Sequence, residues 1–281
     1  MSQATGSGGR NGSYQNWLAA GAFPVAVAAY SGVALAKEKA PLALPGEVVL
    51  YQYEACPFCN KVKAFLDYHD ISYKVVEVNP IGKKELKWSE YKKVPVLVVD
   101  GEPLNDSTNI ISLLDERIYG KDKKPVASNT EEEKWRSWVD DYFVHLLSPN
   151  IYRTPSEALE AFDYITTNGN FTAWERAYAK YSGAIAMYFV GKRLKKKHNI
   201  EDERRDLFQA ADKWVDAVGG RQFMGGEKPN LADLAVFGVL RPIRNMQTGR
   251  DLMANSKIGP WYARMEAEVG ESNRLSDAPH V

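Results

Sequence analysis

A Cys-x-x-Cys pair constrains this chain more than any other feature. Both cysteines of the 281 residues lie in Cys56-Pro57-Phe58-Cys59, shortly after the apolar run at 48–51. A C-x-x-C placed between a strand and a helix is typical of a thiol-redox site, because the helix N-terminus faces the first sulfur and stabilises its thiolate. Cys56 is therefore the candidate reactive residue, and Cys59 is the candidate second thiol.

Two other roles for this pair are disfavoured. A structural zinc site needs about four ligands, and the remaining nitrogen candidates are four scattered histidines without a metal-binding spacing: His69, His145, His198 and His280. A secreted protein stabilised by disulfides is short and cysteine-dense, which this chain is not. The sequence therefore predicts no metal site and favours a reducing compartment.

Charge and composition limit the partners. Lys and Arg together number 36, as do Asp and Glu, so no net field favours nucleic acid or a polyanionic substrate. The length and the 44% of hydrophobic residues allow about two domains with a buried core. We expect a small apolar substrate as the partner and no nucleic acid.

The N-terminal residues 1–46 differ from the rest of the chain. Residues 1–16 are rich in Gly, Ser and Asn and are expected to be disordered. Residues 17–36 carry no charge and are long enough to cross a bilayer, although Gly and Pro interrupt them. We expect membrane association through 17–36, followed by a linker. The alternative is a cleaved targeting segment or an interfacial one.

Residues 47–120 alternate between the periodicities of strands and helices, which is typical of an α/β unit. Strands are expected at 48–53, 73–78, 94–99 and 102–104, and helices at 60–68, at 83–91 and after a cap at Asp106 or Ser107. The first two strands must be parallel, because a helix lies between them. Asp100-Gly101 predicts a hairpin turn. This order, βαβαββα, predicts the thioredoxin fold.

Two features of this unit indicate a glutathione site. Pro95 opens a predicted strand, which suggests a bulge or a cis Val94–Pro95 bond that would present the main chain of Val94 to an extended thiol peptide. Asp106 and Ser107 open a helix, whose N–H groups and hydroxyl could hold the charged end of such a peptide. The simpler alternatives are an ordinary strand entry and an ordinary N-cap.

The rest of the chain contains no strand signal. A polar linker is expected at 121–130, an all-α domain at 131–270 and a tail at 271–281. Helices are expected at 131–147, ended by Ser148-Pro149, and at 156–166, 173–197, 203–218, 230–241 and 259–268. The basic run at 192–197 is most simply a solvated helix end, and a surface for acidic lipid is the alternative.

Residues 228–234 resemble the N-capping box of glutathione transferases, with Asn230 as the cap and Asp233 at the third helical position. The resemblance implies a structural role for both residues. The predicted fold class is thus a thioredoxin-like α/β domain followed by an all-α domain of the glutathione transferase type.

Six segments together resemble the membrane-associated prostaglandin E synthase type 2 family: 50–59, 75–80, 92–97, 104–107, 148–155 and 223–236. The likeness covers roughly residues 47–268. It implies an isomerase that converts the endoperoxide prostaglandin H2 to prostaglandin E2, with Cys56 as the catalytic thiol and Tyr53 hydrogen-bonded to its sulfur. Cys59 would be dispensable for that reaction.

The same resemblance implies the ligands. Glutathione would lie along Val94 and Pro95 and reach Asp106 and Ser107. Haem is a second ligand, with its iron near the Cys56 thiolate. A homodimer and an N-terminal membrane anchor are also implied, with the active domain in a reducing compartment such as the cytosolic face of a membrane, a mitochondrion or a plastid.

The connection between the two domains, at 120–130, is shorter than in the animal members that the resemblance suggests. Two other functions therefore stay open. One is a glutathione-dependent thiol-disulfide oxidoreductase, in which Cys56 attacks a mixed disulfide and Cys59 resolves it. The other is a non-enzymatic membrane protein that binds glutathione or haem.

Overall fold

The computed structural model of the chain describes residues 46–79, 82–120, 130–162 and 173–275. The predicted membrane segment at 17–36, most of the linkers and the last six residues lie outside these ranges. Within the described ranges, no helix has both the length and the apolar character needed to cross a bilayer.

A four-stranded mixed sheet forms the first part of the fold, in the order β2-β1-β3-β4. It contains β1 (Val48–Gln52), β2 (Lys74–Glu77), β3 (Val96–Val99) and β4 (Glu102–Asn105). β1 and β2 are parallel, which confirms that prediction, while β3 is antiparallel to both β1 and β4. Asp100 and Gly101 both have positive φ angles, 52° and 82°, as a tight β3–β4 hairpin turn requires.

Helix α1 (Pro57–Tyr68) begins three residues earlier than predicted, because Pro57 occupies its first turn, where a missing N–H costs nothing. Helix α2 (Ser107–Tyr119) is capped by Asp106. The helix predicted at 83–91 was wrong and is only a 3-10 turn, Lys84–Leu86. The Lys92 ammonium donates to the carbonyls of Leu86 and Ser89. In a helix over 83–91 the Leu86 carbonyl would instead accept from the main-chain N–H of Glu90.

The helical part begins with α3 (Glu131–Trp138), a π-helical segment (Val139–Phe143) and α4 (Val144–Ile151). Thr130, predicted as linker, caps α3. The predicted helix end at Ser148-Pro149 was wrong, since α4 continues through Pro149. The Tyr152 N–H donates to the Ser148 carbonyl at 3.1 Å, so helical bonding resumes after the proline. A proline in the last turn of a helix removes few bonds.

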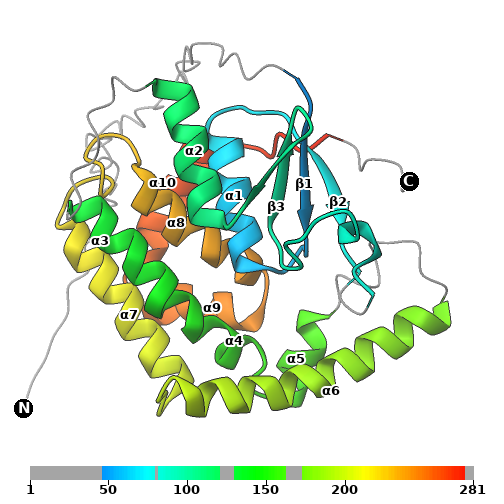
Figure 1. Cartoon of the computed structure of the whole chain (residues 1–281). Helices are drawn as coiled ribbons and strands as arrows, with labels where there is room; N and C mark the ends of the chain where they lie inside the picture. The colour runs from blue at the N-terminus through cyan, green and yellow to red at the C-terminus, as the bar shows by residue number, and fades with distance from the viewer. Residues whose placement is uncertain (1–45, 80–81, 121–129, 163–172, 276–281) are drawn as a thin grey trace, which may run out of the picture. The chain divides into compact units, whose positions relative to one another are not determined.

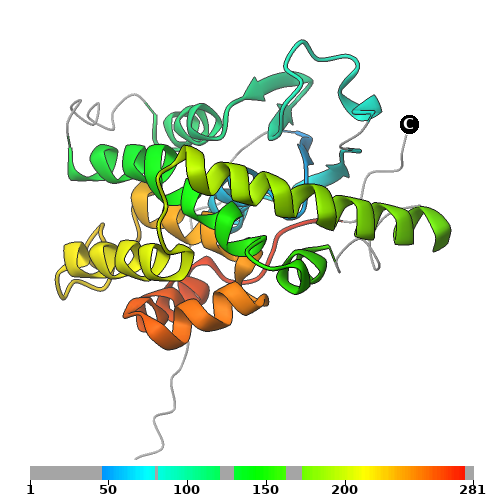
Figure 2. The ribbon, with the colours of Figure 1, turned by 90° about the horizontal axis from the view of Figure 1, so that it is seen from below.

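The remaining helices are α5 (Pro155–Ala161), α6 (Ala173–Lys197), α7 (Glu203–Val218), α8 (Leu231–Leu240), α9 (Gln247–Asn255) and α10 (Ile258–Val269). Helix α9 was not predicted, and the end of the helix predicted at 156–166 lies outside the described residues. Figure 1 shows α1 between the sheet and α8, and Figure 2 shows α6 crossing α4 and α5.

Helix α8 is buried along its whole length, and the capping box predicted at its start is confirmed. The Asn230 side chain accepts from the Asp233 N–H at 3.1 Å, and the Asp233 carboxylate accepts from the Asn230 N–H at 3.0 Å. The same carboxylate accepts from the Trp261 indole at 3.2 Å, which joins α8 to α10.

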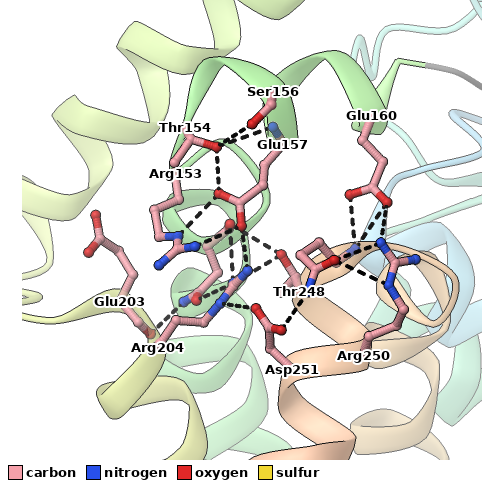
Figure 3. A network of polar contacts seen from close by, with 12 residues as sticks. Arg153, Thr154, Ser156, Glu157, Glu160, Glu203, Arg204, Thr248, Arg250 and Asp251 are labelled. Atoms are coloured by element: carbon pink, nitrogen blue, oxygen red, sulfur yellow. Dashed lines mark hydrogen bonds and ion pairs between the residues drawn. The ribbon is translucent and has the colours of Figure 1, made fainter.

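A network centred on Arg204 of α7 fixes the end of α4 (Figure 3). The Arg204 guanidinium donates to the Asn150 side chain at 2.9 Å, to Glu157 at 2.6 Å and to Asp251 at 3.0 Å. Its partners lie on α4, α5 and α9, so one buried cation joins four helices. Removing one partner of such a buried pair is strongly destabilising.

Residues 272–275, expected to be part of a tail, lie along the edge of the sheet beside β2. The Tyr73 N–H donates to the Asn273 carbonyl at 3.2 Å, and the Leu275 N–H donates to the Tyr73 carbonyl at 2.8 Å. The Asn273 N–H also donates to the buried Asp67 carboxylate at 3.0 Å. We call this segment the C-terminal strap; it brings Arg274 to the thiol-bearing loop.

Candidate active site

Cys56 is the N-cap residue of α1, at the point where the loop after β1 enters the helix. Its N–H donates to the Tyr53 carbonyl, and its carbonyl accepts from the Asn60 N–H, both at 3.0 Å. The buried Asn60 side chain also donates to the Glu54 carbonyl at 2.8 Å. Asn60 of α1 therefore fixes the loop that connects β1 to this helix. Cys56 is half-buried, Cys59 is buried, and both are free thiols.

The two thiols differ in acidity. A hydrogen bond from the Cys59 thiol, opposed by burial and aided by the main-chain N–H groups of Phe58 and Cys59, lowers the pKa of Cys56. Burial, with the adjacent Cys56, raises the pKa of Cys59 well above its ordinary value. Cys56 is thus the more acidic thiol of the pair, and Cys59 donates a hydrogen bond to it.

A cluster of charges behind the loop also acts on the sulfur. The Lys63 ammonium, only 7% exposed, pairs with Glu54 at 2.8 Å, and Arg274 of the strap pairs with the same carboxylate at 3.2 Å. Lys63 contributes to the lowered pKa of Cys56. Sequence analysis assigned no role to these three residues. In the sequence, only its position one helical turn after Cys59 could have indicated that Lys63 lies near the thiols.

Three tyrosines lie close enough to Cys56 to interact with its charge: Tyr53, Tyr91 and Tyr152. Burial first, and then the charge of Cys56, raises the pKa of Tyr152 to about 12. Burial likewise raises the pKa values of Tyr53 and Tyr91. All three phenols therefore keep their protons at neutral pH and can donate hydrogen bonds.

Only Tyr53 of these three was predicted. No hydrogen bond joins its hydroxyl to the Cys56 sulfur among the residues that the structure describes, so its suggested role stays a prediction. Tyr152 follows the end of α4, and Tyr91 follows the 3-10 turn. Their distance in sequence from the thiol explains why no local pattern indicated them.

The residues predicted to bind glutathione lie just before β3 and just after β4, two neighbouring strands of the sheet. The Val94–Pro95 bond is cis, and it leads into β3. Asp106 follows β4 and is the N-cap of α2, and Ser107 is the first residue of that helix. The Asp106 carboxylate accepts from the N–H groups of Thr108 and Asn109, both at 3.0 Å. Asp106 therefore uses two of the N–H groups that the sequence had suggested for a ligand.

The start of α2 is held by a buried lysine that sequence analysis missed. Lys61 of α1, 1% exposed, donates to the Thr108 hydroxyl at 3.0 Å and pairs with Asp140 of the π-helical segment. The Thr108 hydroxyl donates to the other Asp140 oxygen at 2.5 Å. Arg136 of α3 donates to the Thr108 carbonyl at 3.2 Å. The helical part thus fixes the position of the Asp106–Ser107 corner.

Comparison with known proteins gives the family. The chain is 47% identical over 265 residues to prostaglandin E synthase 2 of Danio rerio, a match that covers 78% of this chain and 70% of that protein. It is 46% identical over 283 residues to prostaglandin E synthase 2 of Mus musculus, with 83% and 73% covered. The chain belongs to the prostaglandin E synthase 2 family. The resemblance read from the sequence is confirmed.

The fold of this prostaglandin E synthase 2 family member is that of the glutathione transferases. Residues 50–121 match the family described as glutathione S-transferase, N-terminal domain. The solved structure of glutathione S-transferase III in its apo form superposes with a TM-score of 0.53 at 15% identity, and covers 79% of this chain and 92% of that one. The predicted fold class is therefore confirmed.

Proposed function

We propose that this chain is a thiol- and glutathione-dependent isomerase that converts the endoperoxide prostaglandin H2 to prostaglandin E2. The observation that carries the proposal is the lowered pKa of Cys56 at the start of α1, in a chain nearly half identical to proteins named prostaglandin E synthase 2. A thiolate is the nucleophile that an O–O bond requires.

Cys56 and a neighbouring phenol together provide a route from the endoperoxide to the product. The Cys56 thiolate attacks one endoperoxide oxygen, the O–O bond breaks, and its electron pair passes to the other oxygen, which takes a proton from a neighbouring phenol. That oxygen becomes the hydroxyl of the product. The phenolate then removes the proton from the carbon that carries the sulfur-bound oxygen. The C–H electron pair forms the carbonyl, the O–S bond breaks, and the thiolate leaves with its electron pair. No electron is gained or lost overall.

Tyr152 and Tyr53 are the phenols proposed for this proton transfer. The raised pKa of Tyr152, about 12, keeps it protonated until the alkoxide forms. A phenol with a high pKa donates readily to a strongly basic alkoxide. Replacing Tyr152 with Phe should slow the isomerisation by about a hundredfold, within the usual range for general acid catalysis, and leave the alkylation of Cys56 intact.

Glutathione would be held by the main chain of Val94 beside Pro95 and by Asp106 and Ser107. Asp106 would attract the ammonium group, and the N–H and hydroxyl of Ser107 would donate to the carboxylate of the γ-glutamyl end. When bound, glutathione supplies a second thiol beside Cys56. The support is the glutathione transferase fold together with the fixed corner at the start of α2.

The test is prostaglandin H2 turnover by the full chain and by two matched variants. Cys56→Ser should abolish turnover, because a hydroxyl is not ionised at neutral pH. Cys59→Ser should retain turnover, since Cys59 only hydrogen-bonds to the nucleophile. Full activity of Cys56→Ser would refute the assignment.

A second candidate is a glutathione-dependent thiol-disulfide oxidoreductase. It is favoured by the opposite pKa shifts of Cys56 and Cys59, which suit an attacking and a resolving thiol. Cys59→Ser separates the two functions: it should impair two-thiol reduction of a small disulfide and spare isomerisation. Reduction of the disulfide by the wild type, impaired in Cys59→Ser and without prostaglandin H2 turnover in either protein, would favour the oxidoreductase.

Haem binding, a homodimer and association with a membrane through residues 17–36 remain proposals from the family resemblance, as do the domain limits at 46, 120 and 130. Cys56 would hold the haem iron through its thiolate. Absorbance in the Soret region that disappears in Cys56→Ser would support haem as a ligand. The non-enzymatic alternative requires such binding without turnover.

A further inference from the structure

Helix α6 exposes apolar side chains that the proposed reaction does not use. Tyr181, Ile185 and Phe189 are 57%, 62% and 65% exposed, and they are spaced four residues apart. Residues at this spacing form a stripe on one side of a helix. A contiguous exposed apolar stripe marks an interaction surface, whereas single exposed apolar residues do not.

The same side of α6 becomes basic toward its C-terminal end. At 100° per residue, Lys192, Arg193 and Lys196 fall on the side of the helix that carries the apolar stripe, and Lys197 lies at its flank, about 120° from Ile185. Lys192 lies 4.0 Å from the Glu203 carboxylate. Arg193, Lys196 and Lys197 are exposed and form no ion pair with any residue the structure describes. The sequence of α6 after Glu175 contains no acidic residue.

The opposite side of α6 is covered by the protein itself. A Cβ at Gly183 would lie 2.5 Å from the Phe162 ring, and one at Gly191 would lie 3.1 Å from the Cβ of Tyr152. Figure 2 shows the crossing of α6 with α4 and α5. The helix is therefore anchored through its inner side, and its apolar and basic side chains face outward.

A second copy of the chain suits this surface poorly. A stable protein interface takes about 20–30 residues a side, far more than one stripe offers. Packing two α6 helices in parallel would bring their basic ends together, because the helix has no acidic residue after Glu175. An anionic bilayer instead offers apolar depth to the stripe and phosphates to the basic end.

We infer that α6 docks on an anionic phospholipid surface, with Tyr181, Ile185 and Phe189 in the interface and Arg193, Lys196 and Lys197 on the headgroups. This contact is separate from the N-terminal segment at 17–36. Because Gly191 packs on Tyr152, the docked helix borders the thiol site on its inner side. An apolar substrate would then reach the site from the bilayer.

The test is flotation of the full chain with vesicles of phosphatidylcholine, with and without phosphatidylserine. Ile185→Ser combined with Phe189→Ser should lower the ratio of bound to free protein on anionic vesicles by about tenfold or more. Arg193→Gln, Lys196→Gln and Lys197→Gln together should lower it by a similar factor on anionic vesicles only.

Matched controls remove equal surface character elsewhere. Trp88→Ser deletes an aromatic side chain that is 50% exposed, and the triple change of Lys84, Lys87 and Lys93 to Gln removes three exposed charges. Both controls should bind like the wild type. Circular dichroism melting of every variant identifies any loss of fold, and turnover in detergent reports the active site separately.

Two results would overturn the inference. Unchanged binding of both α6 variants would assign all vesicle binding to other parts of the chain. Loss of binding in the apolar variant alone would exclude anionic headgroups as the partner of the basic residues. Sedimentation velocity would then show whether the stripe instead mediates a dimer that needs Ile185 and Phe189.

Discussion

Thiol acidity in this chain is set by individual side chains around Cys56. Cys59 and the N–H groups at the start of α1 act from within the same turn, while Lys63 acts through its charge from the next turns of the helix. Lys63 is held in place by Glu54, which is itself paired with Arg274. The lowered pKa of Cys56 therefore depends first on Cys59 and the start of α1, and to a smaller extent on a buried cation that Glu54 holds in place.

Lys63→Met tests this dependence. Loss of the ammonium should raise the pKa of Cys56, so alkylation of Cys56 by iodoacetamide should slow at pH 7 and reach the wild-type rate at high pH. Mass spectrometry identifies the labelled cysteine. Lys74→Met, which removes a surface lysine paired with Glu47, is the control and should leave the pH profile unchanged. An unshifted profile in Lys63→Met would exclude this lysine from the site.

Asp106 has two separable roles, and two substitutions distinguish them. Asp106→Ala should lower the free energy of unfolding by about 1 kcal/mol through loss of the N-cap, and weaken glutathione binding by about 1–3 kcal/mol. Asp106→Asn keeps the cap and tolerates the positive φ of 67°, so it should retain stability and lose only the charge-assisted binding. Urea unfolding and calorimetric titration with glutathione measure the two effects. Equal glutathione affinity in all three proteins would contradict the proposed contact.

At the scale of the elements, α1 is positioned by close packing on α8. A Cβ on Gly238 would lie 2.5 Å from the Lys61 Cα and 2.9 Å from the Asn60 carbonyl oxygen. The two helices therefore approach with backbone nearly in contact. From the other end, the C-terminal strap binds Asp67 in the last turns of α1.

Gly238→Ala should separate α1 from α8 and lower the free energy of unfolding by about 1–3 kcal/mol, the usual cost of overpacking. Because α1 carries both cysteines, alkylation kinetics of Cys56 should change as well. Gly259→Ala is the matched control: it lies in α10, and its nearest contact would be an ordinary 3.7 Å. It should be neutral or slightly stabilising. Equal stability of the two variants would show that α1 and α8 can separate freely.

At the scale of the whole molecule, the parallel pair β1 and β2 brings two half-buried carboxyl groups together beside the thiol loop, those of Glu54 and Glu77. Glu77 accepts from the Glu54 N–H at 2.8 Å, and the Gln52 side chain donates to both Glu54 and Glu77. Burial raises the pKa of Glu77 from its ordinary value of 4.5 to about 7. The charge of Glu54 adds to this effect, so the fold prefers Glu77 protonated.

Stability should consequently depend on pH through Glu77. An acid with a higher pKa in the folded state stabilises the fold fully below pH 4.5, and that contribution is lost as the pH rises through 7. The loss should reach about 3 kcal/mol by pH 8. Glu77→Gln should remove this component, so the difference in unfolding free energy between wild type and variant should slope between pH 5 and pH 8. A constant difference for Glu77→Gln would mean that Glu77 titrates normally.

Much of the fold could be predicted because its determinants are local. The strand and helix periods placed β1, α6 and α7 within a residue of their limits. The caps at Asp106 and Asn230 were readable because a short polar side chain reaches N–H groups only two or three residues away. The helix predicted at 83–91 was wrong. The Lys92 side chain donates to the Leu86 carbonyl of this segment, and the periodicity of the sequence gives no sign of such a contact.

The sequence by itself indicated the candidate reactive thiol, its helix and the order of most elements, since these depend on neighbours within one or two turns. The tertiary structure alone decided what surrounds the sulfur. Lys63, Tyr152 and Arg274 come from three separate parts of the chain. Lys63 lies on α1 itself, but Tyr152 and Arg274 reach the site only once α4 and the strap have packed beside α1, because charge and burial act through space.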